Sequence, residues 1–291
     1  MVDKTSLKNF LKKLGIEPRR FTTIFNRLSI QKALGEQGRN GLVKQLEEIV
    51  PDITDQYSRK WEWNEFWEIK VRGLHAFQCS LMVKALETFS PGRRTVVDIG
   101  DSSGAHMLYL KAIAKNGYEV NSLSVNLDSV AVEKIKARGL PAMLCRAEDL
   151  DPMDLKVDLF TSFEMVEHLH DPVRFFRRLA KKSNCERILI TVPYVRSSRI
   201  GLHYIRNQFR SPISAEGVHI LELSPEDWTL LMLHAGWRLI YQQVYYQYPR
   251  KWPILNRIMG WYWRNVDFEG FWGAILEKDT YWSDFYQDWE D

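Results

Sequence analysis

The sequence predicts an α/β protein with a doubly wound parallel sheet. Between residues 95 and 192, short apolar and β-branched runs alternate with segments of helical period, as strands and crossover helices do in parallel sheets. After residue 237 the alternation stops, and two strand-like runs, at 238–246 and 270–277, have no convincing crossover helix between them. An antiparallel pair at one edge of the sheet would explain this end of the chain.

The individual elements follow from the local pattern. Strands are predicted at 95–99, 120–125, 142–145, 157–162 and 187–192. Helices are predicted at 105–115, 130–138, 172–182 and 225–234. Two helix starts carry capping signals, because Asp171 precedes Pro172 and Ser224 precedes Pro225, with acidic residues in the first turn of the latter helix.

The N-terminal region, residues 1–90, is predicted to be helical with polar breaks. A longer apolar pattern in it runs from Trp63 to Phe89, and Pro91-Gly92 ends that pattern. An earlier amphipathic stripe is formed by Leu7, Phe10, Leu11 and Leu14. We expect this region to cover the α/β domain as a helical cap.

Composition limits the classes of partner. A chain of 291 residues with 45% hydrophobic content can bury one sizeable core. A net charge of +3 is too small to indicate nucleic acid binding. The widely spaced Cys79, Cys145 and Cys185 indicate reduced thiols, and no disulfide framework or metal site is predicted. No apolar run is long enough to span a bilayer and the start lacks a signal-peptide core, so a cytoplasmic protein is expected.

The most informative segment is the loop that follows the first predicted strand. It has the form Asp-x-Gly-x-x-x-Gly, from Asp98 to Gly104, and a helical segment follows it. Glycines at such a turn let a ligand approach the backbone, and the next helix directs its first N–H groups at that ligand. The loop has neither the Gly-x-Gly-x-x-Gly pattern of dinucleotide sites nor the lysine of a P-loop. It predicts a nucleotide-type cofactor site.

With four further segments, this loop resembles the class I S-adenosylmethionine-dependent methyltransferases of small-molecule type. The segments follow in the expected order over roughly residues 95–278, at 147–150, 157–169, 190–194 and 219–225. The resemblance implies a Rossmann-like, seven-stranded, mostly parallel sheet with an antiparallel last strand. It also implies S-adenosylmethionine as cofactor and a methyltransferase domain, which we expect at 91–280 with a lid loop at 194–218. Residues 281–291 form an acidic, aromatic tail.

The resemblance also implies which residues bind the cofactor. The first loop would contact its methionine part, with Asp98 holding either the loop amides or the cofactor ammonium; Ser102 stands where relatives often have a further glycine. The implied cofactor set is Asp98, Gly100, Asp101, Ser102, Ser103, Gly104, Asn126, Leu127, Glu148, Asp149, Phe163 and Glu164.

Two positions in that set have alternatives. Relatives usually have an acid for the ribose hydroxyls where this chain has Asn126, and a neutral amide is a weaker acceptor than a carboxylate. Asp128 could substitute, or it could simply cap the next helix. Glu148 and Asp149 resemble the acids at the adenine edge, or they form a solvated pair.

Catalytic and substrate residues are the least constrained. Glu167-His168 and His219 are candidate catalytic groups, because imidazole titrates near neutral pH, and helix packing is the alternative for the Glu-His pair. Four lid arginines, Arg196, Arg199, Arg206 and Arg210, could bind an anionic substrate or be a solvated surface. The substrate candidates are Arg72, His75, Tyr194, Arg196 and Arg199.

The predicted function is methyl transfer from S-adenosylmethionine to an oxygen or nitrogen atom of a small-molecule or glycan-type metabolite. The alternatives are a protein methyltransferase and a cofactor-binding scaffold without catalysis, which Ser102 and Asn126 keep open. The sequence leaves the oligomeric state and the acceptor undetermined.

Overall fold

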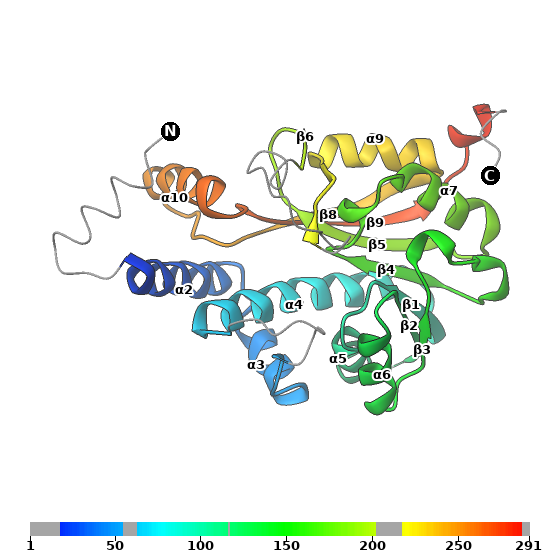
Figure 1. The fold of residues 1–291 in the computed structure, drawn as a ribbon, viewed down its shortest axis with the longest axis horizontal. Helices are drawn as coiled ribbons and strands as arrows, with labels where there is room; N and C mark the ends of the chain where they lie inside the picture. The colour runs from blue at the N-terminus through cyan, green and yellow to red at the C-terminus, as the bar shows by residue number, and fades with distance from the viewer. Residues whose placement is uncertain (1–17, 55–62, 116, 202–216, 287–291) are drawn as a thin grey trace.

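A seven-stranded sheet with helices on both faces organises the computed structural model, which describes residues 18–54, 63–115, 117–201 and 217–286 (Figure 1). The strand order is β3-β2-β1-β4-β5-β9-β8. All neighbours from β3 to β5 are parallel, β9 runs antiparallel to β5, and β8 runs antiparallel to β9. The strands are β1 Gly92–Ile99, β2 Tyr118–Asn126, β3 Ala142–Leu144, β4 Leu159–Phe163, β5 Arg187–Pro193, β8 Trp237–Tyr246 and β9 Gly270–Lys278. The predicted doubly wound sheet with its antiparallel edge pair is confirmed.

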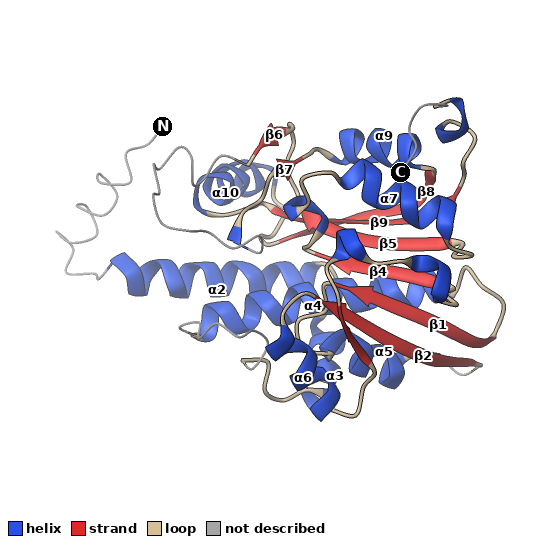
Figure 2. Cartoon of the chain, turned by 45° about the vertical axis from the view of Figure 1, so that its right-hand side comes forward, coloured by secondary structure: helices blue, strands red, loops and turns tan. Residues whose placement is uncertain are grey.

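Burial explains why these runs form central strands. Every residue of β4 is buried, and so are all but the first of β5, as expected for parallel strands covered on both faces. The helices are α2 Pro18–Glu36, α3 Asn40–Ile49, α4 Glu65–Leu86, α5 Ala105–Ile113, α6 Ser129–Ala137, α7 Pro172–Lys182, α9 Pro225–Ala235 and α10 Pro253–Val266. Helices α4 and α5 share one hydrophobic core with α2 and α3, whereas α7 and α9 build the core on the other face (Figure 2).

Capping residues fix where the principal helices begin. Asn64 accepts hydrogen bonds from the backbone N–H groups of Phe66 and Trp67 and so starts α4. Asp171 and Ser224 cap α7 and α9, as their sequence signals predict. Helix α4 packs on β4, β5 and β9, so the N-terminal region forms part of the main core. The amphipathic stripe at 7–14 lies outside the described residues.

One helix departs from the prediction. Between β8 and β9 the sequence indicates no convincing helix, and the structure has α10 there. Its buried residue Trp263 donates from its indole N–H to Ser29 of α2 over 3.1 Å. Gly260 is needed because a Cβ there would lie 2.8 Å from the Tyr248 hydroxyl oxygen. Contacts with residues more than 200 positions away stabilise this helix, so its own periodicity does not reveal it.

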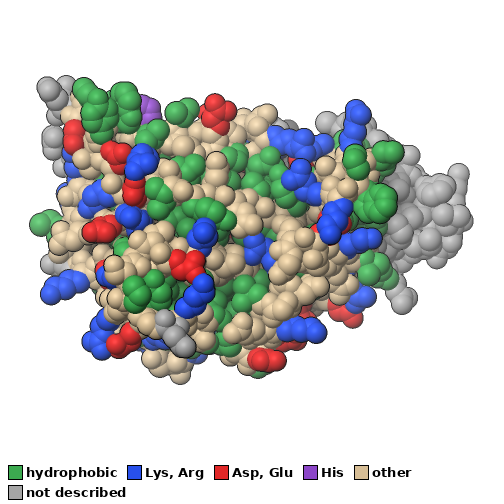
Figure 3. Space-filling view, turned by 180° about the vertical axis from the view of Figure 1, so that it is seen from behind, with side chains coloured by type: hydrophobic (Ala, Val, Ile, Leu, Met, Phe, Trp, Pro, Cys, Tyr) green, Lys and Arg blue, Asp and Glu red, His purple; other side chains and the backbone are tan. Residues whose placement is uncertain are grey.

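Smaller elements complete the chain. The short helices are η1 Ala147–Asp149, η2 Pro152–Asp154, η3 Val166–His168 and η5 Ser283–Phe285, and β6 Arg199–Ile200 pairs with β7 Leu221–Glu222. Acidic and basic side chains alternate over the face in Figure 3 rather than gathering by sign, as the small net charge leads one to expect. None of the helices in the described part of the chain combines the length and apolarity that crossing a membrane requires.

Candidate active site

A cavity of about 360 Å³ lies at the carboxyl ends of β1, β2 and β4. This edge of an open α/β sheet is where such folds bind ligands. The loop after β1, the end of β2, the segment 145–148 and the segment after β4 form most of its wall. The rest comes from His106 of α5, from His219 and from the N-terminal region, which contributes Trp63, Trp67, Val71, Leu74, His75 and Gln78. The helical cap is therefore a wall of the site.

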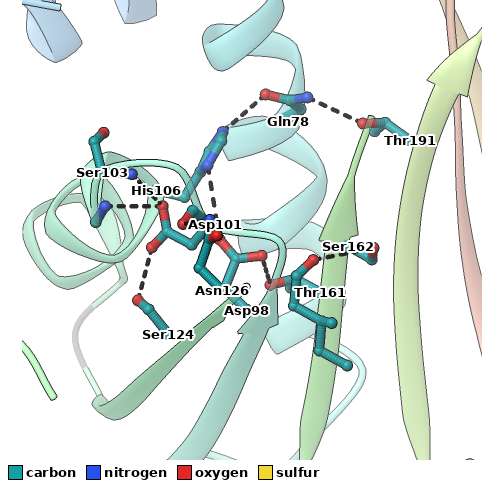
Figure 4. Close-up of polar contacts among 12 residues, drawn as sticks. Gln78, Asp98, Asp101, Ser103, His106, Ser124, Asn126, Thr161, Ser162 and Thr191 are labelled. Atoms are coloured by element: carbon teal, nitrogen blue, oxygen red, sulfur yellow. Dashed lines mark hydrogen bonds and ion pairs between the residues drawn. The ribbon is translucent and has the colours of Figure 1, made fainter. Parts of the chain in front are cut away.

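Asp98, the last residue but one of β1, lines this cavity and has a buried carboxylate oxygen without a hydrogen-bond partner. Its side chain is 1% exposed, and the Thr161 hydroxyl donates to Oδ1 over 2.9 Å (Figure 4). Oδ2 has no hydrogen-bond partner and lies 3.7 Å from Nδ1 of His106. Burial, followed by the charge of Asp101, holds the pKa of Asp98 well above its usual range. A cationic group entering the cavity would stabilise the ionised carboxylate.

Asp101 and Asn126 hold the loop itself. Asp101 accepts hydrogen bonds from the backbone N–H of Gly104 over 2.8 Å and from the Ser124 hydroxyl over 2.7 Å (Figure 4). Asn126 donates to the backbone carbonyl of Asp101 over 2.7 Å, and its side-chain oxygen accepts from the N–H of Asp128. Both residues line the cavity, but their side chains bind the protein itself. Asp128 caps α6 through the N–H of Val130, so the capping alternative for this residue is confirmed.

The two loop glycines have positive φ angles and close neighbours. Gly100 has a φ of 95°, and a Cβ on it would lie 2.9 Å from Cγ of Met165. Gly104 has a φ of 77°, and a Cβ there would lie 2.7 Å from Cδ1 of Leu140. Gly100 lines the cavity, whereas Gly104 lets α5 begin directly after the loop.

The cavity fits the chemistry of S-adenosylmethionine, which carries an ammonium and a sulfonium cation. The free oxygen of Asp98 can accept from an ammonium group, and Gly100 leaves room beside the backbone. At the other end, Glu148 lines the cavity among Leu127 and Ala147. The predicted cofactor residues that line the cavity are Asp98, Gly100, Asp101, Ser102, Asn126, Leu127, Glu148, Phe163 and Glu164; Ser103, Gly104 and Asp149 are not in its wall.

A buried chain of polar side chains crosses the cavity wall between α4, α5 and β5. Gln78 donates to the Thr191 hydroxyl over 3.0 Å, so its side-chain oxygen is left to accept from Nε2 of His106 over 2.8 Å (Figure 4). Burial lowers the pKa of His106 to about 3, which keeps the imidazole neutral. His75 packs on His106 with ring centroids 4.8 Å apart, and its Nδ1 has no partner. Sequence reasoning missed His106, although its place in the first turn after the glycine loop was a usable signal.

Two glutamates and two histidines gather at the end of β4. Glu164 lines the cavity with a φ of 52°, and burial raises its pKa to about 8. Glu167 is 1% exposed, and burial and the charge of Glu164 hold its pKa well above its usual range. His168 and His219 both line the cavity, with ring centroids 4.8 Å apart. The predicted catalytic candidates therefore converge, with Glu167 behind the cavity wall.

The predicted substrate residues are mostly elsewhere. His75 lines the cavity, but Arg72 does not: its buried guanidinium donates to the carbonyls of Val50 and Pro51 after α3. Arg196 forms a bidentate ion pair with buried Glu269. Tyr194 and Arg196 border a separate surface depression, and Arg199 pairs with Glu222. The part of the predicted lid at 202–216, including Arg206 and Arg210, lies outside the described residues.

Comparison with known proteins finds a family match for the central part of the chain. Residues 97–183 match the family model of a methyltransferase domain. The chain therefore carries a class I S-adenosylmethionine-dependent methyltransferase domain, with the cofactor that the resemblance implied. A search of curated proteins finds no match to the chain.

Solved structures share the fold at low sequence identity. A putative sarcosine dimethylglycine methyltransferase from Galdieria sulphuraria is 13% identical, with a TM-score of 0.53 over 81% of this chain and 96% of that one. A cyclopropane synthase from Mycobacterium tuberculosis is 15% identical, with a TM-score of 0.51 over 80% and 93%. The N1-methyltransferase of 1,6-didemethyltoxoflavin from Burkholderia thailandensis, solved with S-adenosylhomocysteine, is 14% identical, with a TM-score of 0.50 over 71% and 78%. These likenesses establish the fold alone.

Proposed function

We propose that this methyltransferase transfers a methyl group to an oxygen or nitrogen atom of a small-molecule or glycan-type metabolite. The observation that carries the proposal is the continuity of the cavity. The space bordered by Gly100 and Asp98 extends to Trp67, His75 and His219 without a dividing wall. Cofactor and acceptor could therefore meet in one enclosed site between the sheet edge and α4.

The cofactor supplies an activated methyl group, so the protein mainly aligns the acceptor and excludes water. The acceptor's lone pair forms a bond to the methyl carbon, the carbon–sulfur bond breaks with its electron pair on sulfur, and the acceptor loses its proton. Trp63, Trp67 and Leu74 supply apolar wall at the α4 side. Asp98 would hold the cofactor ammonium.

The departing proton has two candidate acceptors. His168 bonds through Nδ1 to the carbonyl of Val218 over 2.7 Å, and His219 through Nδ1 to Glu222 over 3.4 Å. Because Nδ1 carries the hydrogen in such bonds, Nε2 is the basic nitrogen of each neutral ring. Either Nε2 could take the proton of an acceptor in the cavity.

Isotope transfer tests the proposal. S-adenosylmethionine with a radiolabelled methyl group is incubated with a panel of phenols, carboxylic acids, amines and glycosides, and in parallel with a protein extract. We expect label to enter a small molecule, and to do so far less with Asp98→Asn than with Asp284→Asn, an exposed aspartate outside the cavity wall. If label entered only proteins of the extract, the proposal that the methyl acceptor is a small molecule would be contradicted.

A cofactor-binding protein without transfer is the second candidate. Asn126 favours it, because this residue replaces the usual acid and its amide already bonds to the main chain. Tight binding of S-adenosylmethionine with no transfer to any acceptor in either arm would support this candidate.

A further inference from the structure

Three potential metal-binding side chains meet at the acceptor end of the cavity. Glu167 and His168 belong to η3, which follows β4, and His219 comes 51 residues after His168. One carboxylate oxygen of Glu167 and one ring nitrogen of each histidine lie within 4.8 Å of one another. Both histidines line the cavity, so a ligand held here would face it.

Main-chain contacts bring these segments together. The N–H of Ile220 donates to the carbonyl of Glu167 over 2.8 Å, and the N–H of Gly201 donates to the carbonyl of Ile220 over 2.9 Å. A Cβ on Gly201 would lie 1.8 Å from the carbonyl oxygen of His219, so only glycine fits at this approach. Main-chain hydrogen bonds, rather than contacts of the imidazole rings, therefore hold the His219 segment against η3.

Each histidine has a partner of the kind that metal-binding histidines usually have. Metal-binding imidazoles typically donate one N–H to a carbonyl or carboxylate, which fixes the ring and directs the other nitrogen at the cation. His168 has the carbonyl of Val218 in this role, and His219 has the carboxylate of Glu222. Glu222 is in turn bonded to Arg199, and the His219 ring stacks on Phe268 with centroids 5.6 Å apart.

Glu167 provides a second, independent observation. It is 1% exposed, and neither carboxylate oxygen has a hydrogen-bond partner on another residue. A buried carboxyl group without a partner is costly, so such a group usually has an ion or a functional role to explain it. Glu164 lies close enough to act electrostatically on Glu167; its own Oε1 is also unpartnered, and its φ of 52° is strained for a residue with a side chain.

We propose that Glu167, His168 and His219 bind a divalent first-row transition-metal cation, which holds an oxygen atom of the methyl acceptor. Two imidazoles with one carboxylate favour Zn²⁺, Co²⁺, Fe²⁺ or Mn²⁺ over Mg²⁺ or Ca²⁺, which prefer oxygen ligands alone. Three protein ligands leave open coordination positions. Since the histidines line the cavity, those positions would be reached from it.

This inference rests on the proposed function and narrows it. A hydroxyl bound to the cation loses its proton more readily, and the cation also fixes its direction. The acceptor atom is then oxygen, and the two histidines act as ligands rather than as bases. The acceptor proton would leave to solvent water at the open side of the cavity.

Metal binding is tested without any methyl transfer. The chelator-treated, full-length protein is titrated with Co²⁺, following the visible absorption of the bound ion, and with Mn²⁺, following the free-ion paramagnetic signal. We expect saturable binding of one ion per chain that Zn²⁺ displaces and Mg²⁺ does not. Glu222→Gln should weaken it about 10- to 100-fold, the range found when a metal-binding histidine loses its outer partner, and Glu167→Gln and His219→Gln, which remove ligands themselves, should weaken it further.

His170→Gln is the matched control, because His170 is an exposed histidine two residues after His168 and outside the cluster. It should bind the metal as the wild type does, and thermal unfolding establishes that each variant is folded. Absence of saturable binding, or binding that Glu167→Gln and His219→Gln leave unchanged, would overturn the inference. Calorimetry with S-adenosylmethionine on the same samples reads the proposed function separately, because Asp98 and Gly100 are not among the three ligands.

Discussion

Asp98→Asn separates a ligand-binding aspartate from one that only orders the loop. The substitution keeps an oxygen for the hydrogen bond from Thr161 and replaces Oδ2, which has no hydrogen-bond partner, with an amide nitrogen. If Asp98 binds the cofactor ammonium, the variant loses a charge-assisted hydrogen bond. If Asp98 only supports the fold, cofactor affinity does not depend on its charge.

The expected loss follows from the kind of bond. Hydrogen bonds to a charged group contribute about 1.5–3 kcal/mol, which corresponds to a dissociation constant raised about 10- to 150-fold. The free energy of unfolding should rise, or should stay within about 1 kcal/mol of the wild-type value, because the variant removes a buried carboxyl group whose charge is unfavourable there. Opposite effects on binding and stability are the signature of a functional residue.

Calorimetry with S-adenosylmethionine and S-adenosylhomocysteine measures the affinity, and urea unfolding of the cofactor-free protein measures stability. Asp101→Ala is the contrasting variant, because Asp101 accepts from the N–H of Gly104 and from Ser124. It should cost about 2 kcal/mol of stability, because these buried donors lose their acceptor. If Asp98→Asn binds the cofactor as tightly as the wild type, or unfolds as readily as Asp101→Ala, the assigned role of Asp98 is refuted.

Three further perturbations test the site. Gly100→Ala should weaken cofactor binding at least about 10-fold, because φ is 95° and the new Cβ meets Met165; equal calorimetric affinity would contradict this. Arg72→Ala should lower the free energy of unfolding by about 2 kcal/mol in urea while leaving cofactor affinity unchanged, since its buried guanidinium binds carbonyls after α3. His106→Gln should flatten the acid side of the stability profile. Burial lowers the pKa of His106 from 6.5 in the unfolded chain to about 3 in the folded chain. Below pH 6.5 the unfolded state therefore binds one more proton than the folded state, and the free energy of unfolding decreases as the pH is lowered. Between pH 7 and 5 the wild type should therefore lose about 2 kcal/mol more than the variant, and parallel urea profiles would exclude a buried neutral imidazole.

Several elements could be predicted because their signals are local. Helix α7 is predicted at its observed bounds, since Asp171 and Pro172 fix its first turn through their own neighbours. The loop from Asp98 to Gly104 is recognisable for the same reason: both glycines have positive φ angles that their residue type permits. Strand β1, in contrast, starts three residues earlier than predicted, because pairing with β2 extends it to Gly92.

By itself, the sequence determined the order of the strands and of the predicted helices, which do not include α10, and with it the methyltransferase fold and the sheet edge at which we expect the cofactor to bind. Hydrophobic periodicity, helix caps and turn glycines depend on neighbours within a few residues, so the order of the elements can be predicted from local sequence. Only the tertiary structure decided which polar side chains face the cavity. The Arg72 guanidinium binds carbonyls just after α3, and the Asn126 side chain binds its own loop. His219 meets Glu167 and His168 although it lies 51 residues after His168. Those outcomes depend on long-range packing and main-chain contacts that no local pattern encodes.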